Sequence, residues 1–418
     1  MLSTSDCFSY RNGWLYSEGV ALADIAENAG TPCYVYSSGS VLNRFRAYDD
    51  ALKGLPHQVS YAVKANSNLS LLGLLAGAGA GFDIVSGGEL FRVIKAGGDP
   101  ARAVYSGVGK TVTEIEYALL QGIHSFNCES EGEVTLIGAL AARHGLKARI
   151  ALRVNPHVDA GAHPYISTGM REHKFGIDVA EAEEIYRRAN TSPHLSVEGV
   201  SCHIGSQILS VDPILEALDR LLELAGRLRA AGLPIRHLDL GGGLGVRYKP
   251  GDEAPEIASF TARVREKIEG SGLFLILEPG RSIVAEAGVL LTRVLYRKTT
   301  PAREFLIVDA AMNDLLRPSL YQSHHEILPL RETSRGTVRA DVVGPVCESG
   351  DFLALDREVP NALPGDVLAV WTAGAYGFVL SSNYNSRARP PEVLVQGDTW
   401  RVSRARESYE DLVRGEAV

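Results

Sequence analysis

The chain has 418 residues, of which 45% are hydrophobic, and a formal net charge of -8 at pH 7. This composition is typical of a packed globular protein and argues against a disordered or fibrous chain. Lysine and arginine are scattered without a basic stripe, so a nucleic acid partner is not expected. The length exceeds what one hydrophobic core usually supports, which predicts two domains.

The five cysteines are odd in number and widely spaced, and no two form a Cys-x-x-Cys pair. They are Cys7, Cys33, Cys128, Cys202 and Cys347. We interpret them as reduced thiols of a cytoplasmic protein and expect neither disulfides nor a metal site. The start MLSTSDCFSYRNGW lacks a basic segment followed by an apolar run, and the apolar run LLGLLAGAGAGF is short. Neither a signal peptide nor a membrane span is therefore expected.

In chain order, the first predicted element is a β-hairpin in FSYRNGWLYSEG, where Asn12 and Gly13 separate two aromatic runs. From about residue 58 to 280, short apolar runs then alternate with amphipathic helical patterns. The predicted strands are 58–64, 81–86, 103–106, 125–130, 148–155, 197–205, 237–243 and 273–280. Apolar strands separated by helices predict a parallel sheet, and eight of them predict a closed (β/α)8 barrel, with an open doubly wound sheet as the alternative.

After Pro279 the helical pattern gives way to β-branched runs with turn residues, which predicts a β-sandwich or β-barrel-like domain. We expect the amino-terminal hairpin to join it. The predicted division is a barrel domain at 31–280 and a β domain made of 1–30 and 281–418.

Lys64 stands at the end of the first predicted barrel strand, in SYAVKANSN. In one interpretation its stem packs on apolar neighbours and its ammonium reaches water. In the other, desolvation lowers the pKa of the lysine, and the neutral amine attacks a carbonyl, as in a Schiff base with pyridoxal phosphate.

Active sites of such barrels lie at the carboxyl ends of the strands. The polar or glycine residues predicted there are Lys64, Asp83, Ser86, His203, Ser206, Gly241, Gly242, Gly243, Glu278 and Arg281. An amine, an imidazole, a glycine cluster and a carboxylate at four matching positions predict a ligand site.

Each of these pieces has a structural alternative. The glycines of DLGGGLG predict a phosphate site or only a tight turn, and their spacing does not fit a dinucleotide fingerprint. His203 is a structural histidine or stacks on a flat heterocycle, and Ser206 is a possible phosphate donor. Glu278 pairs with Arg281 or keeps a pyridine nitrogen protonated, so that the ring accepts electrons.

Further candidates follow in the predicted β domain. They are Arg317 and Tyr321 in NDLLRPSLY, Cys347 and Glu348 in GPVCESGD, and Tyr376 in TAGAYGF. Because guanidinium binds carboxylate through two parallel hydrogen bonds, Arg281 and Arg317 suggest an acidic group on the substrate. Surface ion pairs would also explain either arginine, and an inert buried thiol would explain Cys347.

Together, YAVKANSN, FDIVSGGEL, HIGSQ, DLGGGLG, EPGR, RPSLY, CESGD and AYGF occur in the order seen in fold-type III pyridoxal-phosphate-dependent decarboxylases. The chain resembles this family from about residue 8 to 400. The resemblance implies an alanine-racemase-like (β/α)8 barrel followed by a β domain, pyridoxal 5'-phosphate as cofactor, and a cytoplasmic homodimer with shared active sites.

The resemblance also implies roles for single residues. Lys64 would bind the cofactor covalently, His203 would stack on its ring, and Glu278 would pair with the ring nitrogen. The phosphate would be held by Ser206, Gly241, Gly242, Gly243, Pro279, Gly280, Arg281 and Tyr376. The catalytic set would be Lys64, His203 and Cys347, the last as the proton donor.

For the substrate, the resemblance implies meso-diaminopimelate, converted to L-lysine and carbon dioxide in the last step of lysine biosynthesis. Arg281, Arg317, Tyr321 and Tyr376 would bind the distal carboxylate, and Glu348 would bind the distal ammonium. Cys347 and Glu348 would act in the partner subunit's site. The segment HPYISTGMREHKFGI at 163–177 resembles the family's mobile segment over the site.

Two alternatives stay open. A zwitterionic distal end needs a cation and an anion, such as Arg317 and Glu348, whereas ornithine or arginine needs only an acidic contact. One alternative is nevertheless a decarboxylase of the same fold acting on ornithine, arginine or another amino acid. The other is a non-catalytic barrel that binds a phosphate or a metabolite.

Overall fold

The computed structural model describes residues 7–159 and 174–418. The chain divides into two compact units. The barrel unit comprises Asn43–Val246 and Ala254–Ser282, and the sheet unit comprises Met1–Leu42, Arg247–Glu253 and Ile283–Val418.

Eight parallel strands form the barrel unit, and they close on themselves through pairing of β8 with β9. In order around the barrel they are β5 (His57–Ala62), β6 (Gly81–Ile84), β7 (Ala103–Tyr105), β8 (Ser125–Cys128), β9 (Ala148–Asn155), β11 (Leu195–Ser201), β12 (His237–Asp239) and β13 (Phe274–Leu277). A two-residue strand, β10 (Ile177–Asp178), pairs with β9 outside this ring. The predicted (β/α)8 barrel is therefore confirmed, and the open sheet is wrong.

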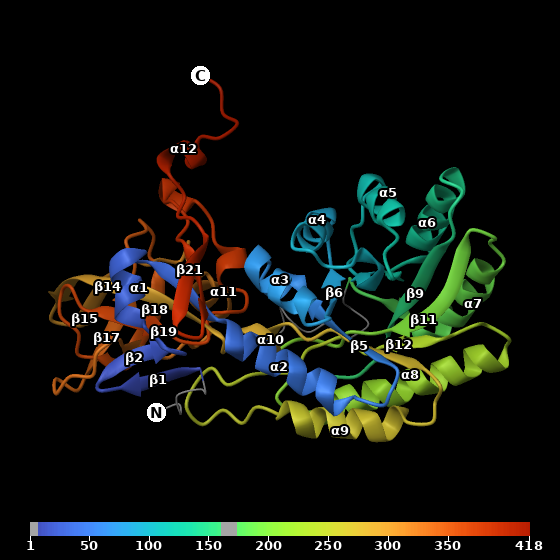
Figure 1. The fold of residues 1–418 in the computed structure, drawn as a ribbon, viewed down its shortest axis with the longest axis horizontal. Helices are drawn as coiled ribbons and strands as arrows, with labels where there is room; N and C mark the ends of the chain where they lie inside the picture. The colour runs from blue at the N-terminus through green and yellow to red at the C-terminus, as the bar shows by residue number, and fades with distance from the viewer. Residues whose placement is uncertain (1–6, 160–173) are drawn as a thin grey trace. The chain divides into compact units, whose positions relative to one another are not determined.

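Helices separate the strands and lie outside them (Figure 1). They are α3 (Leu69–Gly77), α4 (Gly87–Lys95), α5 (Val112–Gln121), α6 (Glu131–Arg143), α7 (Val179–Asn190), α8 (Asp212–Ala230) and α9 (Ile257–Ile268), with α2 (Ser38–Ala51) before the first strand. Their ends follow local chemistry: Thr111 and Glu114 form a capping box at the start of α5, and Gly122 ends that helix with φ 67°. A short 3-10 turn at Val63–Ala65 follows β5, and another at Pro100–Arg102 precedes β7.

Most observed barrel strands are shorter than predicted at their carboxyl ends. The first ends at Ala62, before the turn that carries Lys64, and the seventh ends at Asp239, before the glycine cluster. The polar and glycine tails of the predicted strands are thus loops. Because all side chains of β6, β7 and β8 are buried, the barrel interior is closed below these loops.

The sheet unit contains two sheets. The three-stranded sheet joins β1 (Phe8–Arg11), β2 (Trp14–Ser17) and β3 (Val20–Ala21). The nine-stranded sheet joins β4 (Cys33–Ser37), β14 (Gly288–Thr299), β15 (Glu304–Val308), β16 (Ile327–Pro329), β17 (Thr337–Val343), β18 (Phe352–Pro360), β19 (Val367–Val370), β20 (Glu392–Gln396) and β21 (Thr399–Arg404). The helical elements of this part are α1 (Leu22–Asn28), α10 (Arg281–Val284), α11 (Arg317–Tyr321), α12 (Tyr409–Leu412) and the 3-10 turns Phe378–Leu380 and Tyr384–Ser386.

The amino-terminal hairpin forms as predicted and belongs to the sheet unit. Asn12 and Gly13 turn the chain between β1 and β2 with φ of 50° and 78°. The hairpin meets the later chain through Leu15, whose N–H donates to the carbonyl of Leu330 at 2.8 Å. Phe8 packs edge-on against Trp371, with 5.2 Å between ring centroids.

The chain enters the barrel later than residue 31, where the sequence placed the start of the barrel domain. Strand β4 pairs with β14 and β20 in the nine-stranded sheet, and the barrel unit begins at Asn43. A single apolar strand carries no local mark of the sheet it will join, since both kinds of sheet accept it.

The five cysteines are free thiols, and Cys347 is exposed. In the described part of the chain, no helix has the length and apolar character needed to cross a membrane.

Gly199 on β11 offers a test of the barrel packing. A Cβ atom there would lie 1.9 Å from Nε2 of His237, a buried residue on β12. We expect Gly199→Ala to lower the free energy of unfolding by about 1–3 kcal/mol through overpacking, measured by urea denaturation.

The matched control is Gly226→Ala in α8, where a Cβ atom meets nothing within 4 Å. It is expected to stabilise the protein by up to about 1 kcal/mol through helix propensity. In a His237→Ala background, Gly199→Ala should lower the free energy of unfolding by less than it does in the wild type, because the clashing imidazole ring is absent. An unchanged cost in that background would contradict the assignment.

Candidate functional site

Lys64 lies in the 3-10 turn after β5 and forms an ion pair with Asp83 of β6. Its Nζ is 2.7 Å from Oδ2 of Asp83, whose side chain is fully buried, while the lysine side chain is 32% exposed. The amine is therefore neither a surface lysine that reaches water alone nor an isolated desolvated base. A carboxylate holds it in place at the end of the barrel.

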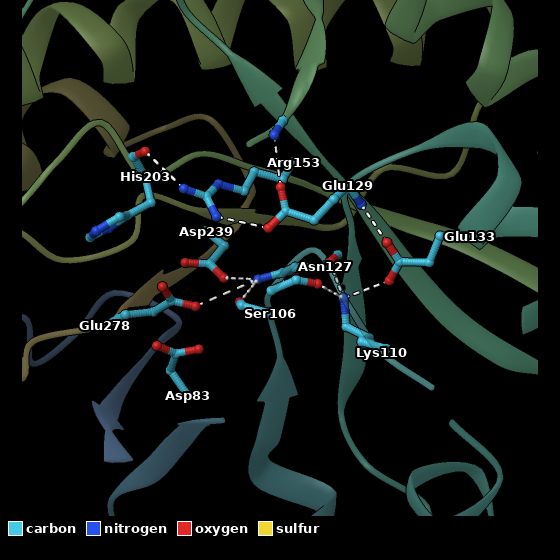
Figure 2. A network of polar contacts seen from close by, with 12 residues as sticks. Asp83, Ser106, Lys110, Asn127, Glu129, Glu133, Arg153, His203, Asp239 and Glu278 are labelled. Carbon is cyan, nitrogen blue, oxygen red and sulfur yellow. Dashed lines mark hydrogen bonds and ion pairs between the residues drawn. The ribbon is translucent and has the colours of Figure 1, made fainter. Parts of the chain in front are cut away.

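Three buried carboxyl groups gather at this end of the barrel. Asp83 lies on β6, Asp239 is the last residue of β12, and Glu278 directly follows β13. Their exposed fractions are 0%, 1% and 5%. Figure 2 shows the three groups on one side of Asn127. The amide nitrogen of Asn127 donates to Asp239 at 2.8 Å, to the hydroxyl of Ser106 at 3.1 Å and to Glu278 at 3.5 Å.

Burial determines the protonation of this group. Desolvation raises the pKa of Asp239 from 3.8 to about 6, against hydrogen bonds from Glu278, Gly241 and Asn127 that lower it. Desolvation, followed by the charges of Asp239 and Asp83, raises the pKa of Glu278 well above its ordinary value. Three carboxyls this close cannot all be ionised without additional positive charge, so the pair of Asp239 and Glu278 holds a proton.

A buried ion pair between Lys110 and Glu133 contacts the backbone of Asn127. Lys110, in the loop after β7, donates to the carbonyl of Asn127 at 2.9 Å and to Glu133 of α6 at 2.5 Å. Glu133 in turn accepts from the N–H of Glu129 at 2.9 Å. The backbone of β8 is thus fixed at the point where the Asn127 amide reaches the carboxyls (Figure 2).

His203 follows β11 and is held through both its ring and its backbone. Its Nδ1 accepts from the N–H of Gly242 at 3.2 Å, and its carbonyl accepts from Arg153 at 3.2 Å. Arg153 also pairs with Glu129 at 2.8 Å. Desolvation, then the charges of Lys64 and Arg153, holds the pKa of His203 well below its ordinary range. The ring is therefore neutral and carries its proton on Nε2.

The glycine cluster after β12 requires glycine at each position. A Cβ atom on Gly241, Gly242 or Gly243 would lie 2.6 Å, 2.1 Å or 2.5 Å from a backbone carbonyl oxygen. Gly241 donates its N–H to Asp239 at 2.9 Å and Gly242 donates to His203. Within the described residues the N–H of Gly243 has no such partner, so it is the candidate of the three for an anion.

The turn after β13 lies beside Lys64 and meets Ser206. The carbonyl of Pro279 accepts from Ala62 at 3.1 Å, and a Cβ atom on Gly280 would come within 3.0 Å of the methyl groups of Ala62 and Ala65. Arg281 donates to the hydroxyl of Ser206 at 3.1 Å. Within the described residues, Glu278 contacts Asp239 and Asn127 and forms no ion pair with Arg281, so that alternative is wrong.

The remaining predicted residues lie in the sheet unit. Arg317 opens α11 and is buried, while Tyr321 ends that helix and is half-buried. Cys347 and Glu348 are exposed between β17 and β18. Tyr376 is half-buried with φ 55°, a conformation uncommon outside glycine.

Several site residues were not singled out from the sequence, namely Asn127, Asp239, Arg153, Glu129 and Lys110. Asp239 lies within the quoted motif DLGGGLG, two residues before Gly241, so the motif contained a signal for it. Asn127 lies inside the predicted strand 125–130, and nothing in that strand distinguished it. Ser86 was singled out but caps α4, accepting from the N–H of Glu89 at 3.2 Å. Of the segment 163–177, residues 163–173 lie outside the described part.

Comparison with known proteins agrees with this geometry. Residues 38–285 match the family model described as pyridoxal-dependent decarboxylase, pyridoxal binding domain. The chain belongs to this pyridoxal-dependent decarboxylase family. The predicted resemblance is thereby confirmed.

Relatives and solved structures extend the match to the full length. A diaminopimelate decarboxylase of Pseudomonas aeruginosa is 56% identical over 99% of both chains, and one of Aquifex aeolicus is 48% identical over 97% of this chain and 96% of that one. The structure of diaminopimelate decarboxylase from Helicobacter pylori complexed with L-lysine has a TM-score of 0.91, with 44% identity and coverage of 94% and 98%. The M. jannaschii enzyme with L-lysine has a TM-score of 0.94, with 35% identity and coverage of 100% and 99%.

The residues present fit the cofactor of this decarboxylase family. Lys64 offers an amine at the barrel end, and Gly243 offers a backbone N–H in a loop whose close packing excludes side chains. The excess of buried carboxyl groups suits a ring nitrogen that carries a proton. Oδ1 of Asp83 is buried without a hydrogen-bond partner in the described residues, which is a polar atom that a bound group can satisfy.

The protonation of the decarboxylase site has a measurable consequence for stability. Because Asp239 has a raised pKa in the folded state, the folded protein binds more protons than the unfolded chain between pH 3.8 and about 6. The stability that this group contributes is present below pH 3.8 and is lost as the pH rises through 6. We expect Asp239→Asn to flatten the fall in unfolding temperature of the cofactor-free protein between pH 5 and pH 7. Equal slopes in wild type and variant would contradict the shared proton.

Proposed function

We propose that this decarboxylase converts meso-2,6-diaminopimelate to L-lysine and carbon dioxide, the last step of lysine biosynthesis, with pyridoxal 5'-phosphate as cofactor. The observation that carries the proposal is the group of three buried carboxyls beside Lys64, in a chain whose full-length relatives are diaminopimelate decarboxylases. Two similar solved structures hold L-lysine, which supports lysine as the product.

When bound, pyridoxal phosphate supplies a conjugated ring that accepts the electrons of the broken bond to the carboxylate. Lys64 would provide the amine that binds the cofactor's aldehyde, and Asp83 holds the Nζ of Lys64 in place at 2.7 Å. Glu278, which Asn127 orients, would pair with the ring nitrogen and favour its protonated form. His203 would stack on the ring, and because its imidazole is neutral it would add no positive charge there.

The phosphate is assigned to the loops that follow the barrel strands. Gly243 supplies a backbone N–H beside Gly241 and Gly242, and Ser206 supplies a hydroxyl that Arg281 orients. Pro279, Gly280 and Tyr376 complete the predicted set.

The substrate is held by residues of opposite charge at its distal end. Arg317, with Arg281, Tyr321 and Tyr376, binds the distal carboxylate, and Glu348 binds the distal ammonium. Cys347 gives its Sγ proton to the carbon that has lost carbon dioxide. This combination of a guanidinium and a carboxylate favours diaminopimelate over ornithine or arginine.

We assign the chain to a cytoplasmic homodimer with shared active sites. Cys347 and Glu348 are exposed on a single copy, as expected for residues that act in the partner's site.

Purified protein with bound cofactor should release equimolar lysine and carbon dioxide from meso-diaminopimelate. Lys64→Ala should lower kcat by about 10³-fold or more and abolish the absorbance of the cofactor bound to the amine. Lys53→Ala, a change at an exposed lysine, is the control and should leave the rate unchanged. If the protein released carbon dioxide from ornithine or arginine and none from meso-diaminopimelate, the substrate assignment would be wrong. A colourless protein without turnover would favour a non-catalytic binding barrel.

Mixing two inactive variants tests the shared site. Lys64→Ala and Cys347→Ala, refolded or exchanged together, should regain up to about a quarter of wild-type activity, because half of the dimers then contain one intact site of two. Lys64→Ala mixed with the double variant Lys64→Ala/Cys347→Ala should stay inactive. No recovery in the first mixture, with dimers present by light scattering, would contradict sharing.

A further inference from the structure

Within the described residues, three neutral side chains contact the guanidinium of Arg317. Its Nη1 lies 3.4 Å from Nε2 of His325, and its Nη2 donates to the hydroxyl of Ser323 at 3.2 Å. Its central carbon lies 4.4 Å from the ring centroid of Tyr248. None of these three partners carries a negative charge, so each orients the guanidinium without neutralising it.

His325 is itself fixed on three sides. Its Nδ1 is 2.8 Å from the carbonyl of Trp371, and its own carbonyl accepts from Arg357 at 2.8 Å. The ring of Tyr248 meets the imidazole edge-on at 5.3 Å. The side chain is fully buried, which leaves the ring little freedom to rotate.

These contacts determine the tautomer of His325. A carbonyl oxygen can only accept, so Nδ1 carries the proton and Nε2 presents a lone pair to Arg317. Burial, then the charge of Arg317, holds the pKa of His325 well below its ordinary range, in agreement with a neutral ring. The imidazole is therefore an acceptor aimed at the guanidinium.

A neutral acceptor and an anion would have opposite effects on ligand binding at this point. A carboxylate beside Arg317 would compete with an incoming carboxylate for the same charge. An imidazole fixes the direction of the N–H donors and itself adds no negative charge beside the guanidinium. Because guanidinium recognition of a carboxylate depends on two parallel hydrogen bonds, its orientation matters as much as its charge.

We propose that His325 is a positioning residue that sets the preference of this enzyme for ligands with a distal carboxylate, by holding Arg317 through its Nε2. The inference rests on the proposed function, since it assumes that Arg317 meets the distal end of the substrate. It adds a residue that touches neither cofactor nor substrate.

The test uses two substitutions that each retain one half of the imidazole. In His325→Gln the amide reaches the place of Nε2, so the acceptor toward Arg317 is kept and the contact with Trp371 is lost. In His325→Asn the shorter amide takes the place of Nδ1, so the contact with Trp371 is kept and the acceptor is lost. His324→Gln is the control, because His324 contacts Glu326 and Arg357.

The readout is competitive inhibition of the holoenzyme by L-lysine and by 1,5-diaminopentane, which lacks the carboxylate. We expect His325→Asn to raise the inhibition constant of lysine and the KM for diaminopimelate by about 10-fold or more. The inhibition constant of diaminopentane and kcat should each change by less than about 2-fold, which is well below the tenfold change that corresponds to about 1.4 kcal/mol. His325→Gln and His324→Gln should keep the wild-type preference.

Each other outcome overturns the positioning role. Equal weakening of both inhibitors in His325→Asn, or an unchanged preference for lysine in that variant, would indicate a structural histidine only. A loss of the lysine preference in His325→Gln as large as the loss in His325→Asn would indicate the same. If the asparagine variant fails to fold, the glutamine variant decides: loss of the lysine preference in it contradicts the proposal, and retention supports it. A wild-type enzyme that does not prefer lysine over diaminopentane would instead refute the proposed function.

Discussion

The structure of the site depends on the burial of three carboxyl groups at one end of a parallel barrel. Asp83, Asp239 and Glu278 come from strands that neighbour one another or lie across the ring, and the fold brings them together in a dry environment. Burial of like charges is unfavourable, and the protein offsets it only in part, with Lys64 on one side and the Asn127 amide on the other. The remaining imbalance fits a ligand ring that brings a positive charge.

A second layer of buried ion pairs keeps this arrangement rigid. Lys110 with Glu133 fixes the strand end that carries Asn127, and Arg153 with Glu129 fixes the loop that carries His203. Removing one partner of such a pair would leave a buried charge without compensation, so both the site geometry and the fold depend on the intact pairs. The same reasoning explains why the glycine cluster has no side chains: its loops approach carbonyl oxygens too closely for a Cβ atom.

The barrel and the strand-end residues were predictable because they depend on local signals. Apolar runs between amphipathic helices give eight strands, and the rule that chemistry lies at strand ends selects Lys64 and Glu278. Asn127 was not predictable as a partner of Asp239 or Glu278, since these residues are separated by 112 and 151 positions and meet only when the barrel closes. The sheet joined by β4 was equally hidden, because strand pairing over such distances leaves no mark in a single strand.

In each of the two units, a neutral hydrogen-bonding side chain orients a charged one: carboxyl groups in the barrel unit and a guanidinium in the sheet unit. Asn127 directs the buried carboxyls through a neutral amide, and His325 directs the guanidinium of Arg317 through a neutral imidazole. In each case a charged partner would hold the group more strongly but would also neutralise it. A neutral hydrogen-bonding group instead fixes direction at a modest energetic contribution and leaves the charge for the ligand. Sequence pattern identifies Glu278 and Arg317, whereas the neutral groups Asn127 and His325 become visible only in the folded structure, because asparagine and histidine have so many other roles.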